Sequence, residues 1–139
     1  EKFTEFYILG PGGKAADYPT RFPAGEEQFL IIGIGNHEYR NVTYTVETIL
    51  VNMTFDTTTN TSSINAYRPL DSFTATLPHN ETREFTYNFT VDDRQYNRLQ
   101  FLLFNETVPS PDVTGQDRIN ASYRDLHLWI TVRPQITTG

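Results

Sequence analysis

The sequence predicts an all-β protein, an immunoglobulin-like antiparallel β-sandwich of about seven strands with two long loops. Val, Ile, Thr, Tyr, Phe and Trp, which favour strands, make up 55 of the 139 residues, against 6 Ala. Apolar and polar residues alternate in several segments that are separated by turn residues, and no long segment has a helical period. The length predicts one domain spanning residues 1–139.

The first two long strands are predicted at residues 3–9 and 28–35. The second is almost continuously apolar, which is typical of a central strand covered on both faces. A polar turn follows it. We expect Asn36 to adopt left-handed geometry there, with Glu38 and Arg40 exposed to water.

The third strand is predicted over residues 41–55, and its apolar positions change phase. They are even-numbered up to Val46 and odd-numbered from Ile49 onward. Because successive side chains of a strand point to opposite faces, one extra residue would produce this change. We therefore predict a β-bulge near Glu47 and Thr48.

Four further segments complete the sandwich. Residues 64–75 predict one or two weak strands broken at Pro69, which suits a sheet edge. Residues 82–91 alternate strictly, and residues 99–105 and 126–133 are also predicted to be strands.

Composition excludes several classes of partner and site. The net charge is −6, which argues against binding to nucleic acid or to anionic lipid, since both need clustered Lys and Arg. The chain has no cysteine and therefore no disulfide or thiolate chemistry. Its longest nearly apolar run, residues 29–35, is far shorter than a membrane span.

Seven of the ten asparagines stand in Asn-X-Ser/Thr triplets, where chance predicts roughly two. A composition rich in Asn and Thr is the alternative explanation. The strand pattern predicts that six of the seven are exposed, as a glycan acceptor must be, and it leaves Asn105 ambiguous. The predicted glycosylation sites are Asn41, Asn52, Asn60, Asn80, Asn88, Asn105 and Asn120.

Five segments together resemble the soluble portion of an archaeal membrane-protein family catalogued as domain of unknown function 1616. They are residues 3–20, 25–27, 33–47, 98–104 and 126–132. The resemblance implies membrane-spanning helices upstream of this sequence and a location on the extracellular face of the cell membrane. It would also explain why the sequence begins without a secretory signal. It implies no activity for any particular residue.

Catalytic patterns are missing, so we expect no enzyme, no cofactor and no metal site. Residues 10–14 lack the spacing of a phosphate-binding loop, and no serine lies in a nucleophile elbow. His37, His79 and His127 stand on separate segments, without the spacing of zinc ligands. The carboxylates do not follow the pattern of a calcium loop.

Trp129 and His127 are the candidate ligand-binding residues. They alternate with the apolar residues of the last strand and are predicted to face away from the core. An exposed aromatic residue there could stack on a sugar or anchor a partner, but we favour the interpretation in which residues 10–23 fold over Trp129 and cover it. The loops 10–27 and 106–123 are long, and long loops often carry function.

We therefore expect a glycosylated structural or interaction domain of a multi-pass membrane protein, with envelope proteins or polysaccharide as partners. A carbohydrate- or ligand-binding sensor module of the cell envelope is the second hypothesis. An accessory subunit of a membrane enzyme is a third.

Overall fold

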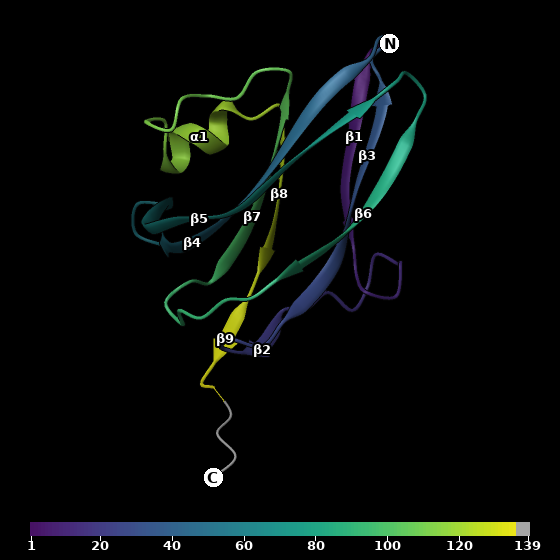
Figure 1. Ribbon diagram of the computed structural model, residues 1–139. Helices are drawn as coiled ribbons and strands as arrows, with labels where there is room; N and C mark the ends of the chain where they lie inside the picture. Colours follow the sequence, from purple (N-terminus) through teal and green to yellow (C-terminus); the bar gives the residue numbers. More distant parts are fainter. Residues whose placement is uncertain (136–139) are drawn as a thin grey trace.

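In the computed structural model, which describes residues 1–135, two antiparallel β-sheets pack face to face (Figure 1). The predicted all-β sandwich is confirmed. One short helix was not expected. The elements are β1 (Phe3–Leu9), β2 (Arg21–Pro23), β3 (Gln28–His37), β4 (Val42–Asp56), β5 (Thr61–Leu77), β6 (Thr82–Phe89), β7 (Arg98–Asn105), α1 (Gly115–Ala121), β8 (Arg124–Trp129) and β9 (Thr131–Arg133).

The sheets have strand orders β1-β3-β6 and β5-β4-β7-β8. The predicted central strand is β3, but the prediction that it is covered on both faces is wrong, because Phe29 on its outer face is 43% exposed. The predicted edge strand is β5, which is continuous through Pro69. The last predicted strand is divided at Ile130. Beyond that residue the chain leaves β7 and β9 pairs with β2 in parallel, closing one end of the sandwich.

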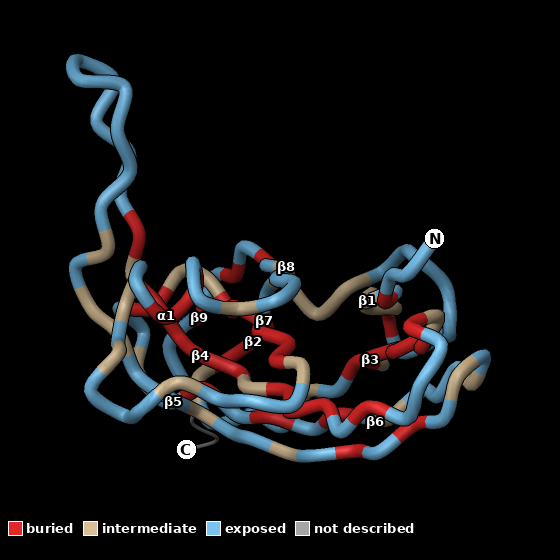
Figure 2. The backbone as a smooth tube through the Cα atoms, turned by 90° about the horizontal axis from the view of Figure 1, so that it is seen from above, coloured by how far each residue is buried: buried red, intermediate tan, exposed pale blue. Residues whose placement is uncertain are grey.

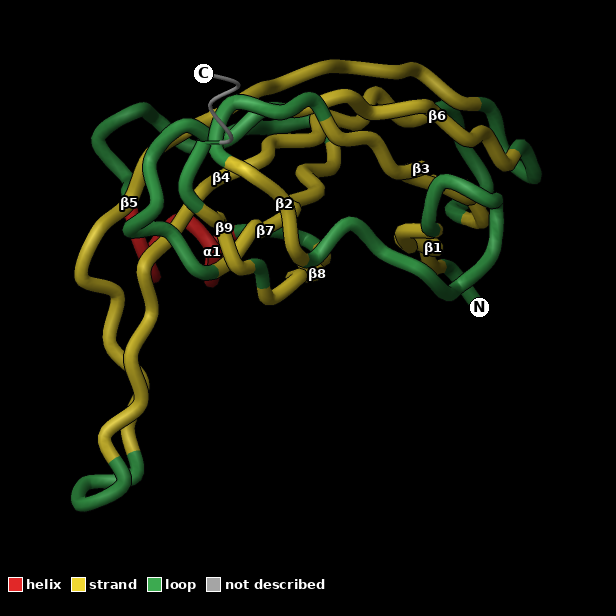
Figure 3. Tube along the Cα trace, turned by 90° about the horizontal axis from the view of Figure 1, so that it is seen from below, coloured by secondary structure: helices red, strands yellow, loops and turns green. Residues whose placement is uncertain are grey.

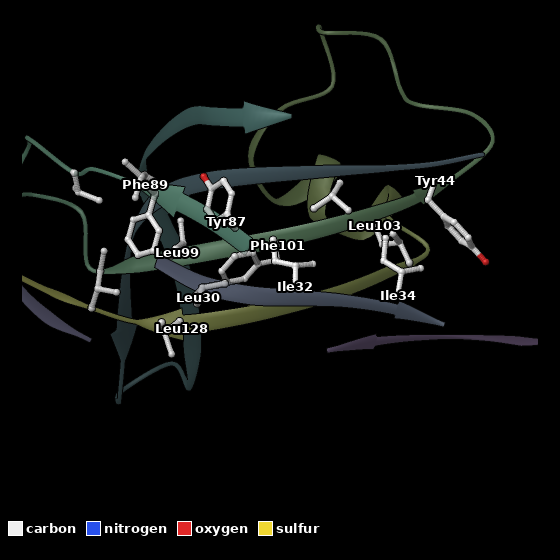
Figure 4. Packing of buried hydrophobic residues seen from close by; sticks show 14 of the residues in the cluster. Leu30, Ile32, Ile34, Tyr44, Tyr87, Phe89, Leu99, Phe101, Leu103 and Leu128 are labelled. Carbon is white, nitrogen blue, oxygen red and sulfur yellow. The ribbon is translucent and has the colours of Figure 1, made fainter. Parts of the chain in front are cut away.

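The core lies between the two sheets (Figure 4). Leu30 and Ile32 of β3 lie toward Phe101 of β7 in this view, and Tyr87 and Phe89 extend the cluster from β6. These alternate positions face inward because a strand places every second side chain on the same face of its sheet. Burial of this apolar surface is the main stabilising contribution to the fold.

A bulge is found at the predicted place, but the prediction that β4 carries its extra residue is wrong. β4 pairs with β7 without interruption from Tyr44 to Val51, so β4 contains no extra residue there. The register shift lies at the expected place, but the extra residue is Leu70 on β5, and Asn65 forms a second bulge. The apolar residues of β4 shift from even to odd positions because the outer face of the strand is also covered from Ile49 onward.

The cover on that outer face is the segment that contains α1. Most residues of β4 are buried along this stretch, as the red tube in Figure 2 shows. Ile119 of α1 packs in a second apolar cluster, separate from the main core. The strand residues of this cluster are Ile49, Val51, Leu102 and Phe104. Apolar residues of both phases are therefore buried in β4.

The turn after β3 also differs from its prediction. Asn36 is buried within the strand, and its amide donates hydrogen bonds to the carbonyl oxygens of Arg40 and Leu77, at 2.9 and 2.8 Å. Tyr39, with φ of 63°, takes the left-handed geometry instead. Arg40 is exposed as expected, but Glu38 is only 6% exposed. The side chains of both Asn36 and Glu38 therefore form hydrogen bonds within the protein and not with water.

The far ends of β4 and β5 project from the body as a two-stranded ribbon (Figure 3). Residues 54–63 are all exposed, including Phe55. The turn at its tip contains Asn60 with φ of 57°, a conformation that asparagine tolerates better than most residues.

Candidate functional site

Trp129 lies on the outer face of the four-stranded sheet, at the edge strand β8. It is directly opposite Arg98 of β7, and His127 is opposite Gln100. Trp129 is 50% exposed, so the favoured interpretation, in which residues 10–23 cover it, is wrong. The Arg98 guanidinium lies 4.9 Å from the centre of the Trp129 ring, and His127 approaches the ring edge at 5.9 Å between centroids.

A series of side-chain hydrogen bonds holds Arg98 in place beside Trp129. Arg98 Nε donates to Oε1 of the fully buried Gln100 at 3.0 Å, and Gln100 Nε2 donates to Asp125 Oδ2 at 2.8 Å. Burial, followed by the charge of Arg98, lowers the pKa of His127. His127 is therefore neutral at pH 7 and can accept as well as donate a hydrogen bond.

This arrangement can stack and hydrogen-bond a ligand. A half-exposed indole beside a guanidinium offers apolar contact, and the neighbouring polar groups offer donors and acceptors. Trp129 and His127 thus lie together. Gln100 and Arg98, which hold this face in place, are not signalled by the sequence because Gln100 occupies an otherwise apolar strand.

None of the seven acceptor asparagines is buried. Asn105, which the sequence left ambiguous, is half-buried, and so is Asn52, although the strand pattern predicted Asn52 to be exposed. The Asn52 amide donates to the carbonyl oxygen of Gln95 at 2.6 Å, and Asn105 Oδ1 accepts from Arg40 at 3.2 Å. The five exposed acceptors are Asn41, Asn60, Asn80, Asn88 and Asn120.

A cavity of about 390 Å³ opens between β4, the edge strand β5 and the segment before α1. Its walls are mostly apolar. The apolar walls include Ile49, Tyr67, Pro69, Leu70 and Pro111. The only sequence features that pointed to this region were Pro69, which indicated a sheet edge, and the length of loop 106–123.

An ion pair between two residues that line the cavity, Glu47 and Arg118, joins α1 to β4. Arg118 donates to both carboxylate oxygens of Glu47, at 2.7 and 2.8 Å. It also donates to the carbonyl oxygens of Pro109, Ser110 and Val113. The hydrogen bonds with Glu47 raise the pKa of Arg118. This pair attaches the α1 segment to the sheet, because both side chains are largely buried.

Asp71 also lines the cavity. Its Oδ2 accepts a hydrogen bond of 2.6 Å from the Tyr87 hydroxyl, which also contacts Thr48 Oγ1 at 2.7 Å. Burial, together with the hydrogen bond to Asp71, raises the pKa of Tyr87, so that it stays protonated. None of the four ion pairs found in residues 1–135 includes Asp71.

A second polar network surrounds the buried Glu38. Its Oε2 accepts hydrogen bonds from the hydroxyls of Thr4 and Tyr123, at 2.7 and 2.6 Å. Burial by itself raises the pKa of Glu38, but these hydrogen bonds and the charges of Arg40 and Lys2 outweigh it, so that the net pKa is lowered. The network ties the chain after α1 to the end of β3.

The three histidines have separate environments. His37 contacts Glu5 at 2.6 Å, and His79 Nδ1 accepts from the backbone N–H of Tyr39. His127 lies beside Trp129. In the described part of the chain, no three His, Cys, Asp or Glu side chains lie close enough together to hold a metal ion.

The sequence model of DUF1616, a domain of unknown function, matches residues 1–131. The chain belongs to the DUF1616 family. This confirms the resemblance found in the sequence. No curated protein matches this DUF1616 chain. No helix within residues 1–135 is long and apolar enough to cross a membrane.

Solved structures share the fold of the DUF1616 chain at low sequence identity. One is the CARDB domain of a Pyrococcus furiosus protein, solved in complex with di-metal ions, with a TM-score of 0.52 and 12% identity, covering 96% of each chain. Another is a β-glucosidase from Listeria innocua in complex with gluconolactone, with a TM-score of 0.54 and 11% identity. The match to the β-glucosidase covers 99% of this chain but only 17% of the enzyme. At these identities the similarity shows the fold alone.

Proposed function

We propose that this DUF1616 chain is an extracytoplasmic, N-glycosylated interaction domain of an archaeal multi-pass membrane protein, and not an enzyme. The observation that carries the proposal is the placement of the seven acceptor asparagines, none of which is buried. They lie on strands, on turns and on α1. Acceptors on several sides suit a domain surrounded by solvent outside the cell.

The fold is compatible with this role. A β-sandwich presents edges, loops and an exposed sheet face to partners without needing a catalytic centre. Here the projecting ribbon and the Trp129 face are accessible, and envelope proteins or polysaccharide are the proposed partners.

The test is the mass of the protein purified from the membrane of its natural host. We expect glycan masses on peptides containing the five exposed acceptors, and lower occupancy at Asn52 and Asn105. Asn65 and Asn97 stand outside the triplets and serve as internal controls that must remain unmodified. An unmodified intact mass would contradict the glycosylated, extracytoplasmic assignment.

Binding of an envelope carbohydrate is a second candidate function, favoured by the half-exposed indole of Trp129. We expect saturable binding to polysaccharide from the host envelope, and we expect Trp129→Ala to abolish it because aromatic stacking is lost. Phe55→Ala is the matched control, since Phe55 is another exposed aromatic residue, on the distant ribbon. Equal binding by the wild type and both variants would exclude this function.

A further inference from the structure

An apolar patch on the outer face of the three-stranded sheet belongs to neither core cluster. It consists of Phe29 and Ile31 of β3 and of Leu9 of β1, which alternate with residues that point into the core. Phe29 is 43% exposed, and Ile31 and Leu9 are half-buried. Covering this patch would remove apolar surface from water, which is favourable.

The ring of Phe29 differs from most of the exposed aromatic rings. Four others each stack on a histidine or lie beside an arginine, namely Phe3, Tyr39, Tyr123 and Trp129. Among the exposed aromatic residues of the described chain, only Phe29 and Phe55 have no such partner. The face of the Phe29 ring is therefore open to a further group.

Asn88, one of the predicted glycan acceptors, lies directly opposite Phe29 in the pairing of β3 with β6. The backbone N–H of Asn36 donates to the carbonyl oxygen of Glu81, so the hydrogen-bonded pairs of this ladder are those with even-numbered β3 residues. Phe29 and Asn88 thus form a non-hydrogen-bonded pair. In such a pair the side chains are close, with about 5 Å between the Cβ atoms.

No other acceptor in the described chain has an exposed aromatic residue opposite it. Asn52 lies opposite Ala66, and Asn105 lies opposite the buried Tyr44. The remaining acceptors lie outside the strands, and they are Asn41, Asn60, Asn80 and Asn120. The combination of an acceptor with an unpartnered aromatic ring is therefore specific to Asn88.

We propose that the first sugar of an N-linked glycan on Asn88 stacks on the Phe29 ring and covers the apolar patch. The inference rests on the proposed function as a glycosylated domain and assigns one glycan a structural contact. The C–H bonds on one face of a pyranose ring carry partial positive charge and suit the negative face of an aromatic ring. Thr86, on the same face of β6 as Asn88, offers a hydroxyl to the sugar.

The glycan also limits where partners can bind. With the patch covered, the outer face of the three-stranded sheet presents sugar in place of apolar side chains. The Trp129 face lies on the other sheet and remains open, so the inference directs protein or polysaccharide partners to that side of the molecule.

The experiment is a double-variant cycle on the 139-residue chain purified with its host glycans. Asn88→Gln removes the acceptor, and Phe29→Thr removes the ring at an exposed strand position, so the fold is retained. We expect Asn88→Gln to lower the thermal midpoint by about 3 °C, the size of one aromatic contact in a chain of this length. In the Phe29→Thr background, we expect the effect to fall to about a third of this or less.

Asn41→Gln is the matched control, because it removes an exposed acceptor that lies outside the strands and has no aromatic ring opposite. It should change the thermal midpoint equally in both backgrounds. NMR gives a direct measurement of the contact. We expect nuclear Overhauser effects between the Phe29 ring protons and the first sugar on Asn88, and an upfield shift of the sugar protons that Phe29→Thr abolishes.

Three results would overturn the inference. The first is an equal effect of Asn88→Gln in both backgrounds, without contacts between the sugar and the ring. The second is an unmodified Asn88 in protein whose other acceptors carry glycans, which would leave the proposed function intact. The third is a concentration-dependent dimer that Phe29→Thr dissociates, because a second copy would then cover the patch. If all acceptors are unmodified, the proposed function fails together with the inference.

Discussion

The outer face of the four-stranded sheet is divided into two regions of opposite character. Toward its β5 edge, α1 covers an apolar cluster that includes Leu102 and Phe104 of β7. Toward β8, the same face of β7 carries Arg98 and Gln100, and the adjacent strand carries the exposed Trp129. A single strand thus contributes to a second core at one end and to a solvent-facing site at the other. The two regions differ because the α1 segment covers the first and leaves the second exposed to solvent.

The largest expected effect is on the covered region. Leu102→Ala should lower the free energy of unfolding by about 3 kcal/mol, because a fully buried leucine is replaced by a cavity. Urea denaturation of the variant and the wild type measures the change. A loss below about 0.5 kcal/mol, the size of an ordinary surface effect, would show that α1 does not cover this residue in solution.

The attachment of the cover comes next in size. Arg118→Met should destabilise the protein by about 2 kcal/mol, because Glu47 is then left largely buried without its partner. The double variant Glu47→Leu with Arg118→Met should regain much of that loss, since no unpaired charge remains. If the double variant is as unstable as the sum of the two single variants, the ion pair does not couple the segment to the sheet.

Glu38 predicts a pH dependence. Its pKa is lowered below the ordinary value of 4.5, so its stabilising contribution is present above about that pH and is lost as the pH falls through the lowered pKa. Tyr123→Phe removes one hydrogen bond to the carboxylate and should cost about 1.5 kcal/mol at pH 7. Denaturation series at pH 7 and pH 3 should show the two proteins converging at the acid end. A difference that does not depend on pH would contradict the assignment.

The smallest effect on stability is expected on the exposed region. Trp129→Ala and His127→Ala should each change the free energy of unfolding by no more than about 0.5 kcal/mol, because neither side chain fills the core. Thermal unfolding measured beside Leu102→Ala gives the comparison directly. Losses as large as that of Leu102→Ala would show that the two regions are one packed unit.

Local pattern predicted much of the fold. Strict alternation in β6 predicted which of its residues face the core, because strand geometry converts spacing directly into orientation. The continuous apolar run in β3 predicted its central place in the sheet, but not the exposure of Phe29. The same reasoning predicted that Trp129 faces outward. It failed for β4, where two apolar phases indicated a bulge, although the strand is covered on both faces.

The candidate cavity could not be predicted in the same way. Tyr67 and Pro69 lie on one strand, but they line a cavity with Pro111 and Arg118 only because loop 106–123 returns across the sheet. Nothing in the spacing of these residues signals that return. Glu38 was likewise expected in solvent, since its partner Tyr123 lies 85 positions away in the sequence.

The sequence by itself determined the all-β class, the positions of most strands, the family and the abundance of glycan acceptors, because each depends on residue type and short-range spacing. Only the tertiary structure decided which outer surfaces are covered, which carboxylate is paired and where a cavity opens. The physical reason is that Glu47 and Arg118, 71 positions apart, meet only after strands have paired and the α1 segment has packed on the sheet. Burial and charge pairing are properties of that assembled surface.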